Sequence, residues 1–454
     1  MRLTISTFAV VLLVVLPVMG LNLERFGYHM PDFFVHSLDV EIYEDLALLT
    51  GYGGFMIYDI SDGGLQYLNR YNPGGGRGTP VYDCTAHDGI GYVFGRAAGM
   101  WVVDISDPRN PSALSSWRPN GQSLEDGVYC GDKLTVSAHD DGLIFLDVSN
   151  PRQPAVIGTF GDMSNCWAVR YERNGYLFVA DGPGGLAILN LAGDEPELVS
   201  RIETTGQAID LRIDNDICAV ATGATGVDLF DISDPENPVF ISNFVTPNYA
   251  GKVGLDENLV AVADWSEVLV YDISDPENAV LNGRKHTEKR AMGVALRGTS
   301  VYLADWGPFR GFNYGEIEGP DIEFSTRRIN PPGDDLVDTT ITVYNLGSEV
   351  LQVNRISCNA PEFGVDPGQF SINPEDSVEI SLTYQPTDQV ATSNMQVQSN
   401  DTDENRANVA LEGIGGLAEG DRAPDFTAPI LSGGEYTLSD QRGRVQLLIF
   451  WASW

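Results

Sequence analysis

The chain has 454 residues, of which 43% are hydrophobic and 10% aromatic, so it can build folded cores and is long enough for about two to four domains. Lys and Arg number 27 against 64 Asp and Glu, which gives a formal charge of −37. Such a charge repels phosphate backbones and anionic lipid, so nucleic acid is not expected as a partner.

The first twenty residues have the pattern of an export signal. Arg2 supplies a positive start, residues 8–18 are almost wholly apolar, and residues 18–20 offer a cleavage site before Leu21. No later segment approaches the roughly 18 apolar residues that a membrane span needs. We therefore expect a signal peptide over residues 1–20, no span after its cleavage, and an extracytoplasmic protein that is periplasmic, secreted or held at the cell surface.

One short phrase, Asp-Ile-Ser-Asp or a close variant of it, ends a strand-like run six times at nearly constant spacing. Successive copies lie 45, 43, 43, 41 and 41 residues apart, starting at Asp59, Asp104, Asp147, Asn190, Asp231 and Asp272. A period of about forty residues made of short strands and turns is typical of propeller blades. Where Pro-x-Asn-Pro follows the phrase, the acidic side chain can cap a turn and the prolines end the strand.

A seventh repeat, over residues 293–317, lacks its outer strand. Residues 23–28 belong to no repeat of their own and resemble the outer strand at residues 154–160. An open ring would expose a strand edge of unpaired backbone groups, and a donated N-terminal strand would remove that edge. The sequence thus predicts a seven-bladed β-propeller over residues 21–317, with residues 21–30 closing the last blade.

These repeats resemble the LVIVD repeat family, whose units carry Asp-Ile-Ser-Asp-Pro-x-Asn-Pro at this position. The resemblance covers residues 35–317. It implies the fold and says little about the ligand, so we expect an unidentified protein or surface ligand for the propeller.

Four aspartates occupy the same position at the start of the first strand of their repeats. They are Asp39, Asp83, Asp126 and Asp210, while Ala168, Lys252 and Gly293 hold that position in the other repeats. If inner strands line a channel, these carboxylates would converge near one mouth and could hold a hard cation such as calcium. The alternative is a solvated acidic rim without a ligand. No cofactor is expected.

None of the five cysteines forms a Cys-x-x-Cys pair. Cys84, Cys130, Cys166, Cys218 and Cys358 fall in or beside predicted strands, where free cysteine behaves as a small hydrophobe. Export would permit disulfides, but the strand positions favour buried thiols.

A second all-β segment is expected over residues 318–416. Its landmarks are Tyr344-Asn-Leu-Gly347, Phe363-Gly-Val365, Ile372-Asn-Pro374 and Ser399-Asn-Asp401. This order resembles the ASH or choice-of-anchor D type of immunoglobulin-like β-sandwich. The resemblance implies a spacer or adhesive module, and the alternative is a stalk that binds nothing.

Residues 417–454 change character again. Ala423-Pro-Asp-Phe426 and Phe450-Trp-Ala-Ser-Trp454 resemble the opening of an AhpC/TSA, thioredoxin-like thiol-disulfide oxidoreductase. In that family a Cys-x-x-Cys pair follows the tryptophan at once, at a helix N-terminus that lowers the pKa of the first thiol. The pair would come directly after Trp454, so no residue is assigned a catalytic role. We expect an incomplete α/β fragment here, as in a truncated gene product.

Two functions remain open. In the first, the parent protein is an exported thiol-disulfide or antioxidant oxidoreductase, carried on the propeller and sandwich and acting on a redox partner. In the second, the chain is a non-catalytic extracytoplasmic binding or adhesion scaffold. A Cys-x-x-Cys pair encoded directly after Trp454 would make the protein an enzyme, and a stop codon there would make it a binder.

Overall fold

The computed structural model describes residues 21–31, 36–73, 79–130, 133–171, 174–193, 195–329, 337–374, 376–385, 391–402, 404–413, 427–429 and 435–437. The regular structure of these residues is β-strand without helix, which confirms the predicted all-β class there. They accordingly contain no helix that could cross a membrane. The expected signal peptide lies outside the described residues, and so do residues 417–454 apart from two short strands.

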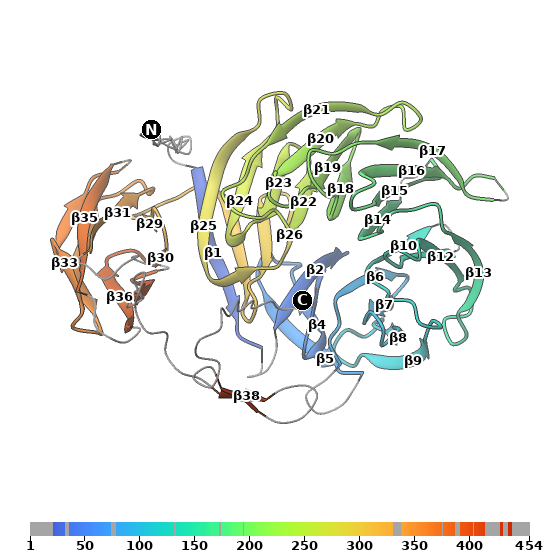
Figure 1. Ribbon diagram of the computed structural model, residues 1–454, viewed down its shortest axis with the longest axis horizontal. Coiled ribbons are helices and arrows are strands. Elements are labelled where there is room, and N and C mark those ends of the chain that lie inside the picture. The colour runs from blue at the N-terminus through green and yellow to red at the C-terminus, as the bar shows by residue number, and fades with distance from the viewer. Residues whose placement is uncertain are drawn as a thin grey trace.

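Between residues 21 and 316, the described strands form seven sheets of four antiparallel strands each (Figure 1). The first three sheets are, in hydrogen-bonded order, β2 (Ser37–Tyr43), β3 (Leu46–Gly51), β4 (Gly54–Asp59) and β5 (Gln66–Tyr71); β6 (Asp83–His87), β7 (Ile90–Phe94), β8 (Met100–Asp104) and β9 (Ser112–Trp117); and β10 (Gly127–Cys130), β11 (Lys133–Ser137), β12 (Leu143–Asp147) and β13 (Ala155–Phe160).

The next three sheets follow the same order along the chain. They are β14 (Ala168–Tyr171), β15 (Tyr176–Ala180), β16 (Leu186–Asn190) and β17 (Glu197–Ile202); β18 (Asp210–Asp214), β19 (Ile217–Ala221), β20 (Val227–Asp231) and β21 (Val239–Phe244); and β22 (Lys252–Asp256), β23 (Leu259–Ala263), β24 (Trp265–Asp272) and β25 (Val280–Ala291).

The last sheet joins the two ends of this region. It contains β26 (Gly293–Arg297), β27 (Ser300–Ala304) and β28 (Phe309–Glu316), and its fourth strand is β1 (Leu21–His29). β1 pairs with β28 so that Leu21 lies opposite Glu316 and His29 opposite Phe309. The first strands of neighbouring sheets contact each other, and β26 contacts β2, so the inner strands form a closed ring.

In the second strand of each sheet all residues after the first are buried, because neighbouring sheets cover both faces of the strand. In β15, Leu177, Phe178, Val179 and Ala180 are all fully buried, and the equivalent residues of β3 and β23 are buried as well. A strand buried on both faces reads as a continuous apolar run and not as an alternation. This explains why the repeat is visible in the sequence as short hydrophobic blocks.

The repeated Asp-Ile-Ser-Asp phrase makes turns. Asp59 accepts hydrogen bonds from the backbone N and the hydroxyl of Ser61, at 3.0 and 2.6 Å, and Asp104 and Asp231 accept from the residue two positions on in the same way. The second aspartate of the phrase also caps a turn, since Asp234 accepts from Glu236 N at 3.2 Å. These contacts confirm the turn interpretation of the phrase.

Two further sheets share one hydrophobic core between residues 322 and 413, with Ile341, Leu382, Met395 and Val409 fully buried. One contains β29 (Ile322–Phe324), β31 (Val337–Asn345), β35 (Ser377–Tyr384) and β33 (Phe363–Asp366); the other contains β30 (Arg328–Ile329), β37 (Arg406–Gly413), β36 (Ala391–Ser399), β32 (Leu351–Cys358) and β34 (Phe370–Ile372). A last pair, β38 (Thr427–Pro429) and β39 (Glu435–Thr437), is antiparallel. We call residues 321–413 the sandwich, because the backbone N of Asp321 donates to Asn345 and its backbone O accepts from Leu346 N.

Candidate functional site

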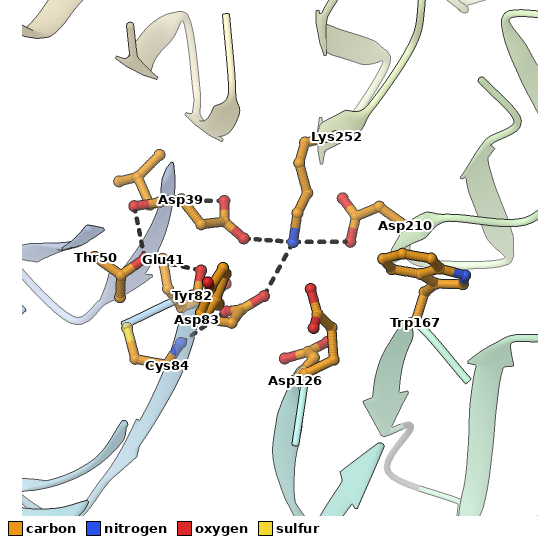
Figure 2. Close-up of polar contacts among 12 residues, drawn as sticks. Asp39, Glu41, Thr50, Tyr82, Asp83, Cys84, Asp126, Trp167, Asp210 and Lys252 are labelled. Atoms are coloured by element: carbon orange, nitrogen blue, oxygen red, sulfur yellow. Dashed lines mark hydrogen bonds and ion pairs between the residues drawn. The ribbon is translucent and has the colours of Figure 1, made fainter. Parts of the chain in front are cut away.

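The four aspartates singled out by the sequence do lie together, around the ammonium group of Lys252 (Figure 2). Asp39, Asp83 and Asp210 stand near or at the start of β2, β6 and β18, and Asp126 directly precedes β10. Lys252 opens β22, so all five come from equivalent positions of different sheets. Its Nζ lies 3.0 Å from Asp83 Oδ2 and 3.9 Å from Asp210 Oδ1, and it also pairs with Asp39.

Two arginines and a glutamate complete what we call the channel cluster. Arg170 on β14 lies 2.6 Å from Asp126 and 3.8 Å from Asp210. Arg212 on β18 lies 3.2 Å from Asp210 and 3.1 Å from Glu41. The cluster therefore contains the carboxylates of Asp39, Glu41, Asp83, Asp126 and Asp210 against the cations of Arg170, Arg212 and Lys252.

Two aspartates of the cluster, Asp126 and Asp210, also connect neighbouring sheets through the backbone. Asp126 accepts a hydrogen bond from Gly127 N at 2.6 Å and another from Val169 N, in the next sheet, at 3.0 Å. Asp210 accepts from Val253 N in the following sheet, also at 3.0 Å. Because these two carboxylates satisfy backbone donors of the adjacent inner strands, they stabilise the contacts between neighbouring sheets of the ring.

Burial dominates the titration of these carboxyl groups. It raises the pKa of Asp83 to about 8, with Lys252 acting in the opposite direction, and it raises the pKa of Asp126 to about 6 against the influence of Arg170. The pKa of Asp39 and that of Asp210 are raised by the same cause. Near neutral pH Asp83 therefore keeps a proton, which reduces the excess of negative charge in the cluster.

The cluster is buried, unlike the solvated acidic rim that the sequence analysis considered as an alternative. The aspartates are not a solvated rim, because Asp39, Asp83, Asp126 and Asp210 are at most 4% exposed. A lysine ammonium lies where a cation was expected, and the described part of the chain has no group of three or more His, Cys, Asp or Glu arranged to hold a metal ion. Calcium binding by these four residues stays a prediction, and the geometry favours an internal salt-bridged cluster.

A second set of equivalent positions lies at the same end of the ring. The second strand of each sheet is antiparallel to the first and ends opposite its start; Asp39, for example, pairs with Thr50 and Lys252 with Ala263. One or two residues after these second strands end come Tyr52, Arg96, His139, Gly182, Gly223, Trp265 and Trp306, which lie 44, 43, 43, 41, 42 and 41 residues apart. We call these seven residues, with the side chains that contact them, the rim.

Aromatic rings follow one another along part of the rim. His36 stacks on Trp306, with ring centroids 4.7 Å apart, and meets Tyr52 edge-on at 5.5 Å. The guanidinium of Arg290 lies 4.7 Å from the Trp265 ring and 5.6 Å from that of Trp306. Tyr249 meets Trp265 edge-on, with ring centroids 6.4 Å apart. Tyr52 and Tyr249 are 37% and 43% exposed, so part of this aromatic surface faces solvent.

The rest of the rim is a hydrogen-bonded polar group. Arg96 donates to both oxygens of Glu125, at 2.6 and 2.8 Å, and its guanidinium lies 3.9 Å from the Tyr82 ring. His139 contacts Glu125 at 3.0 Å and Asn165 at 3.1 Å. Although burial opposes it, hydrogen bonding from His139 and Arg96 lowers the pKa of Glu125, and the bond to Glu125 raises the pKa of His139.

The rim offers exposed ring surface next to fixed polar groups, a combination that binds ligands by stacking and hydrogen bonding. The sequence analysis missed it, although Trp265 and Trp306 recur with the same period as the strands. It also missed Glu41, Arg170 and Arg212, which stand two residues after Asp39, Ala168 and Asp210. Alternate residues of a strand share a face, so this spacing was a usable signal.

The cysteines are not part of a reactive site. Cys84, Cys130, Cys166 and Cys218 are buried and Cys358 is half-buried, and all five are free thiols. Burial raises the pKa of Cys130 to about 12 and raises that of the other four as well. The prediction that the cysteines of the repeats are buried is therefore confirmed.

Comparison with known proteins agrees with the repeated sheets. The LVIVD repeat family matches residues 91–117, 131–162, 205–246 and 247–287. The chain carries LVIVD repeats. Two solved structures are similar in fold. The RRP9 WD40 repeats match with a TM-score of 0.54 and 10% identity, covering 64% of this chain and 100% of that chain. U3-55K matches with a TM-score of 0.53 and 10% identity, covering 63% of this chain and 98% of that chain. At this identity the likeness shows a propeller-like fold alone.

A short segment has a different relative. Over 39 residues the chain is 49% identical to the Thioredoxin-like protein YneN of Bacillus subtilis (strain 168), which is 9% of this chain and 23% of that protein. The chain thus spans less than a quarter of the length of this curated relative.

Proposed function

We propose that this chain is the scaffold of an exported thiol-disulfide oxidoreductase. In this proposal residues 21–317 are a seven-bladed propeller, residues 318–416 an immunoglobulin-like spacer, and residues 417–454 the opening of a thioredoxin-like domain. The 39-residue similarity to a thioredoxin-like protein carries the proposal. The phrases Ala423-Pro-Asp-Phe426 and Phe450-Trp-Ala-Ser-Trp454 support placing that similarity at the C-terminal segment.

The scaffold role is based on the state of the thiols. Reduction of a substrate disulfide needs an accessible thiolate, and burial keeps the thiols of the described residues protonated. The reaction is therefore assigned to a Cys-x-x-Cys pair after Trp454, whose two thiols are oxidised to a disulfide as the substrate disulfide is reduced. The propeller and sandwich would localise this domain or bind its partner.

The test compares two proteins in the reduction of insulin disulfides by dithiothreitol. One is made from the complete reading frame and the other is the present chain of residues 1–454. We expect catalysis by the first, loss of catalysis when its Cys-x-x-Cys cysteines are changed to serine, and none by the second. Equal catalysis by both proteins, or none by either, would contradict the proposal.

The rim supports a second function, that of a binding scaffold without catalysis. Two of its aromatic side chains, Tyr52 and Tyr249, are exposed to solvent and lie among its other aromatic and polar groups. A thermal-shift screen against soluble peptides and glycans tests it. Binding should be weakened at least about tenfold by Tyr52→Ala. Tyr67→Ala is a matched control, since Tyr67 is 40% exposed and lies on the outer strand β5. If Tyr52→Ala and Tyr67→Ala weaken binding equally, or if neither weakens it, the ligand does not bind at the rim and this second function is contradicted.

A further inference from the structure

The outer strand of the sixth sheet differs from its equivalents in length. β25 has 12 residues, whereas β5, β9, β13, β17 and β21 have 6 each. It carries three consecutive basic residues, Arg284, Lys285 and His286, and it contacts both β1 of the last sheet and β29 of the sandwich. Figure 1 shows β25 and β1 next to each other on the side where the sandwich lies.

Asn22 of β1 connects three segments through one buried amide. Its Nδ2 donates to Asp321 Oδ2, just before β29, at 2.8 Å, and its Oδ1 accepts from the backbone N of Arg284 at the same distance. The other oxygen of Asp321 accepts from Lys285 Nζ at 2.7 Å. Asn22 is fully buried and Asp321 is 2% exposed, so no solvent competes for these bonds.

A second group of contacts lies beside the first. His286 touches Glu323 of the sandwich through Nδ1, at 2.9 Å, and Glu267 of β24 through Nε2, at 2.8 Å. Farther along, Arg284 also binds Glu267, at 2.6 Å, and Arg327 joins Glu323 to Glu404. We call this set the joint: the cations of Arg284, Lys285, His286 and Arg327 face the carboxylates of Glu267, Asp321, Glu323 and Glu404.

The balance of charge in the joint depends on contact between the propeller and the sandwich. Removing one partner of a buried ion pair leaves an uncompensated charge, which costs far more than the pair itself gains. Separating β25 from β29 would do this to Lys285 and Asp321 together. Undocking the sandwich would therefore leave Lys285 and Asp321 without their ion-pair partner.

We propose that the sandwich is part of the ring closure: Asp321 locks β1 onto β25, so that the last sheet cannot open unless the sandwich undocks. The proposal goes beyond the proposed function, because it concerns the integrity of the ring and holds whether or not the protein is an enzyme. It also makes the sandwich a fixed arm on the propeller.

Hydrogen-deuterium exchange on the full chain tests this proposal. Asp321→Asn keeps an acceptor for Asn22 but loses the charge that pairs with Lys285, and Asp321→Ala loses both. We expect exchange of the β1 amides to quicken about tenfold or more in the alanine variant and less in the asparagine variant, with the amides of β14 to β17 unchanged. The control is Glu379→Gln, which removes an exposed carboxylate from β35 and should leave β1 unchanged.

Two results would overturn the proposal. One is unchanged protection of β1 in both folded Asp321 variants. The other is faster exchange that is equal in all sheets, which indicates a global loss of stability. If Asp321→Ala does not fold, Lys285→Met provides the same test from the propeller side, because it removes the cation and preserves most of the side-chain volume.

Discussion

At the scale of single residues, the channel cluster shows how a buried carboxyl group is tolerated next to other carboxyl groups. Asp83 is 4% exposed and hydrogen-bonds to Asp39, and both contact Lys252. Burial penalises the charged form, so the pKa of Asp83 rises to about 8 and the group is neutral at pH 7. The proton on Asp83 therefore removes one negative charge from a cluster in which burial also raises the pKa of Asp39, Asp126 and Asp210.

The raised pKa of Asp83 makes the stability of the protein depend on pH. A carboxyl group whose folded-state pKa is raised favours folding fully below its unfolded pKa, near 4, and this contribution is lost as the pH rises through about 8. Urea denaturation should therefore show a decline in the free energy of unfolding between about pH 4 and 8. In Asp83→Asn, a neutral isostere, the decline should be smaller; an identical decline in both proteins would contradict the assignment.

His286 in the joint gives a second pH dependence. Burial disfavours the charged form of His286, but Glu323 and Glu267 outweigh burial and raise its pKa to about 9. The other charged groups nearby are Arg284, which pairs with Glu267, and Lys285, the preceding residue in the chain. Below pH 6.5 the raised pKa adds on the order of 3 kcal/mol to the free energy of unfolding, and this contribution is lost as the pH rises through 9.

The variant His286→Gln should lack this contribution. We expect it to be less stable than the native protein at pH 7 and close to it at pH 10, as measured by urea denaturation at both values. A difference between the two proteins that stays constant from pH 7 to 10 would show that the histidine acts by packing and not by charge.

At the scale of elements, the inner strands approach each other so closely that one position of the ring must be glycine. A Cβ on Gly293 of β26 would lie 2.5 Å from Asp39 Cα, which is backbone of β2 and cannot rotate away. Gly293→Ala should therefore destabilise the protein by about 1–3 kcal/mol or more. Gly315→Ala on β28 is the control, because nothing lies within 4 Å of its Cβ and little change is expected.

The local elements were the most predictable part of the molecule. The recurring phrase at Asp59, Asp104 and Asp231 makes the same turn each time, because the capping chemistry lies within three residues. The charged centre was predicted only in part. The equivalent positions of the four aspartates in their repeats were enough to predict that they lie together. The compensating charges of Arg170 and Arg212 could have been predicted only from the alternation of side chains along β14 and β18.

At the scale of the whole molecule, the sequence could not predict the joint. Asn22 and Asp321 are 299 positions apart, and no period or motif relates them. Their contact depends on how two independently patterned regions dock, which local propensity does not determine. The only sequence sign was the run Arg284, Lys285 and His286 in a strand twice the length of its equivalents.

The two buried charged groups account for little of the formal charge of −37. The joint pairs four cations with four carboxylates, and the channel cluster sets three cations against five carboxylates. Such a charge keeps a large protein soluble and makes its encounters with charged partners depend on ionic strength. The reactive dithiol is proposed to lie in the domain that residues 417–454 begin.

The nucleotide sequence downstream of the Trp454 codon tests this account most directly. A scaffold that carries a thiol-disulfide oxidoreductase predicts an open frame that continues at once with Cys-x-x-Cys and then with enough residues for a thioredoxin-like domain. A stop codon at that place in the native gene, or a continuation without the cysteine pair, would contradict the account and leave the rim of the propeller as the basis for function.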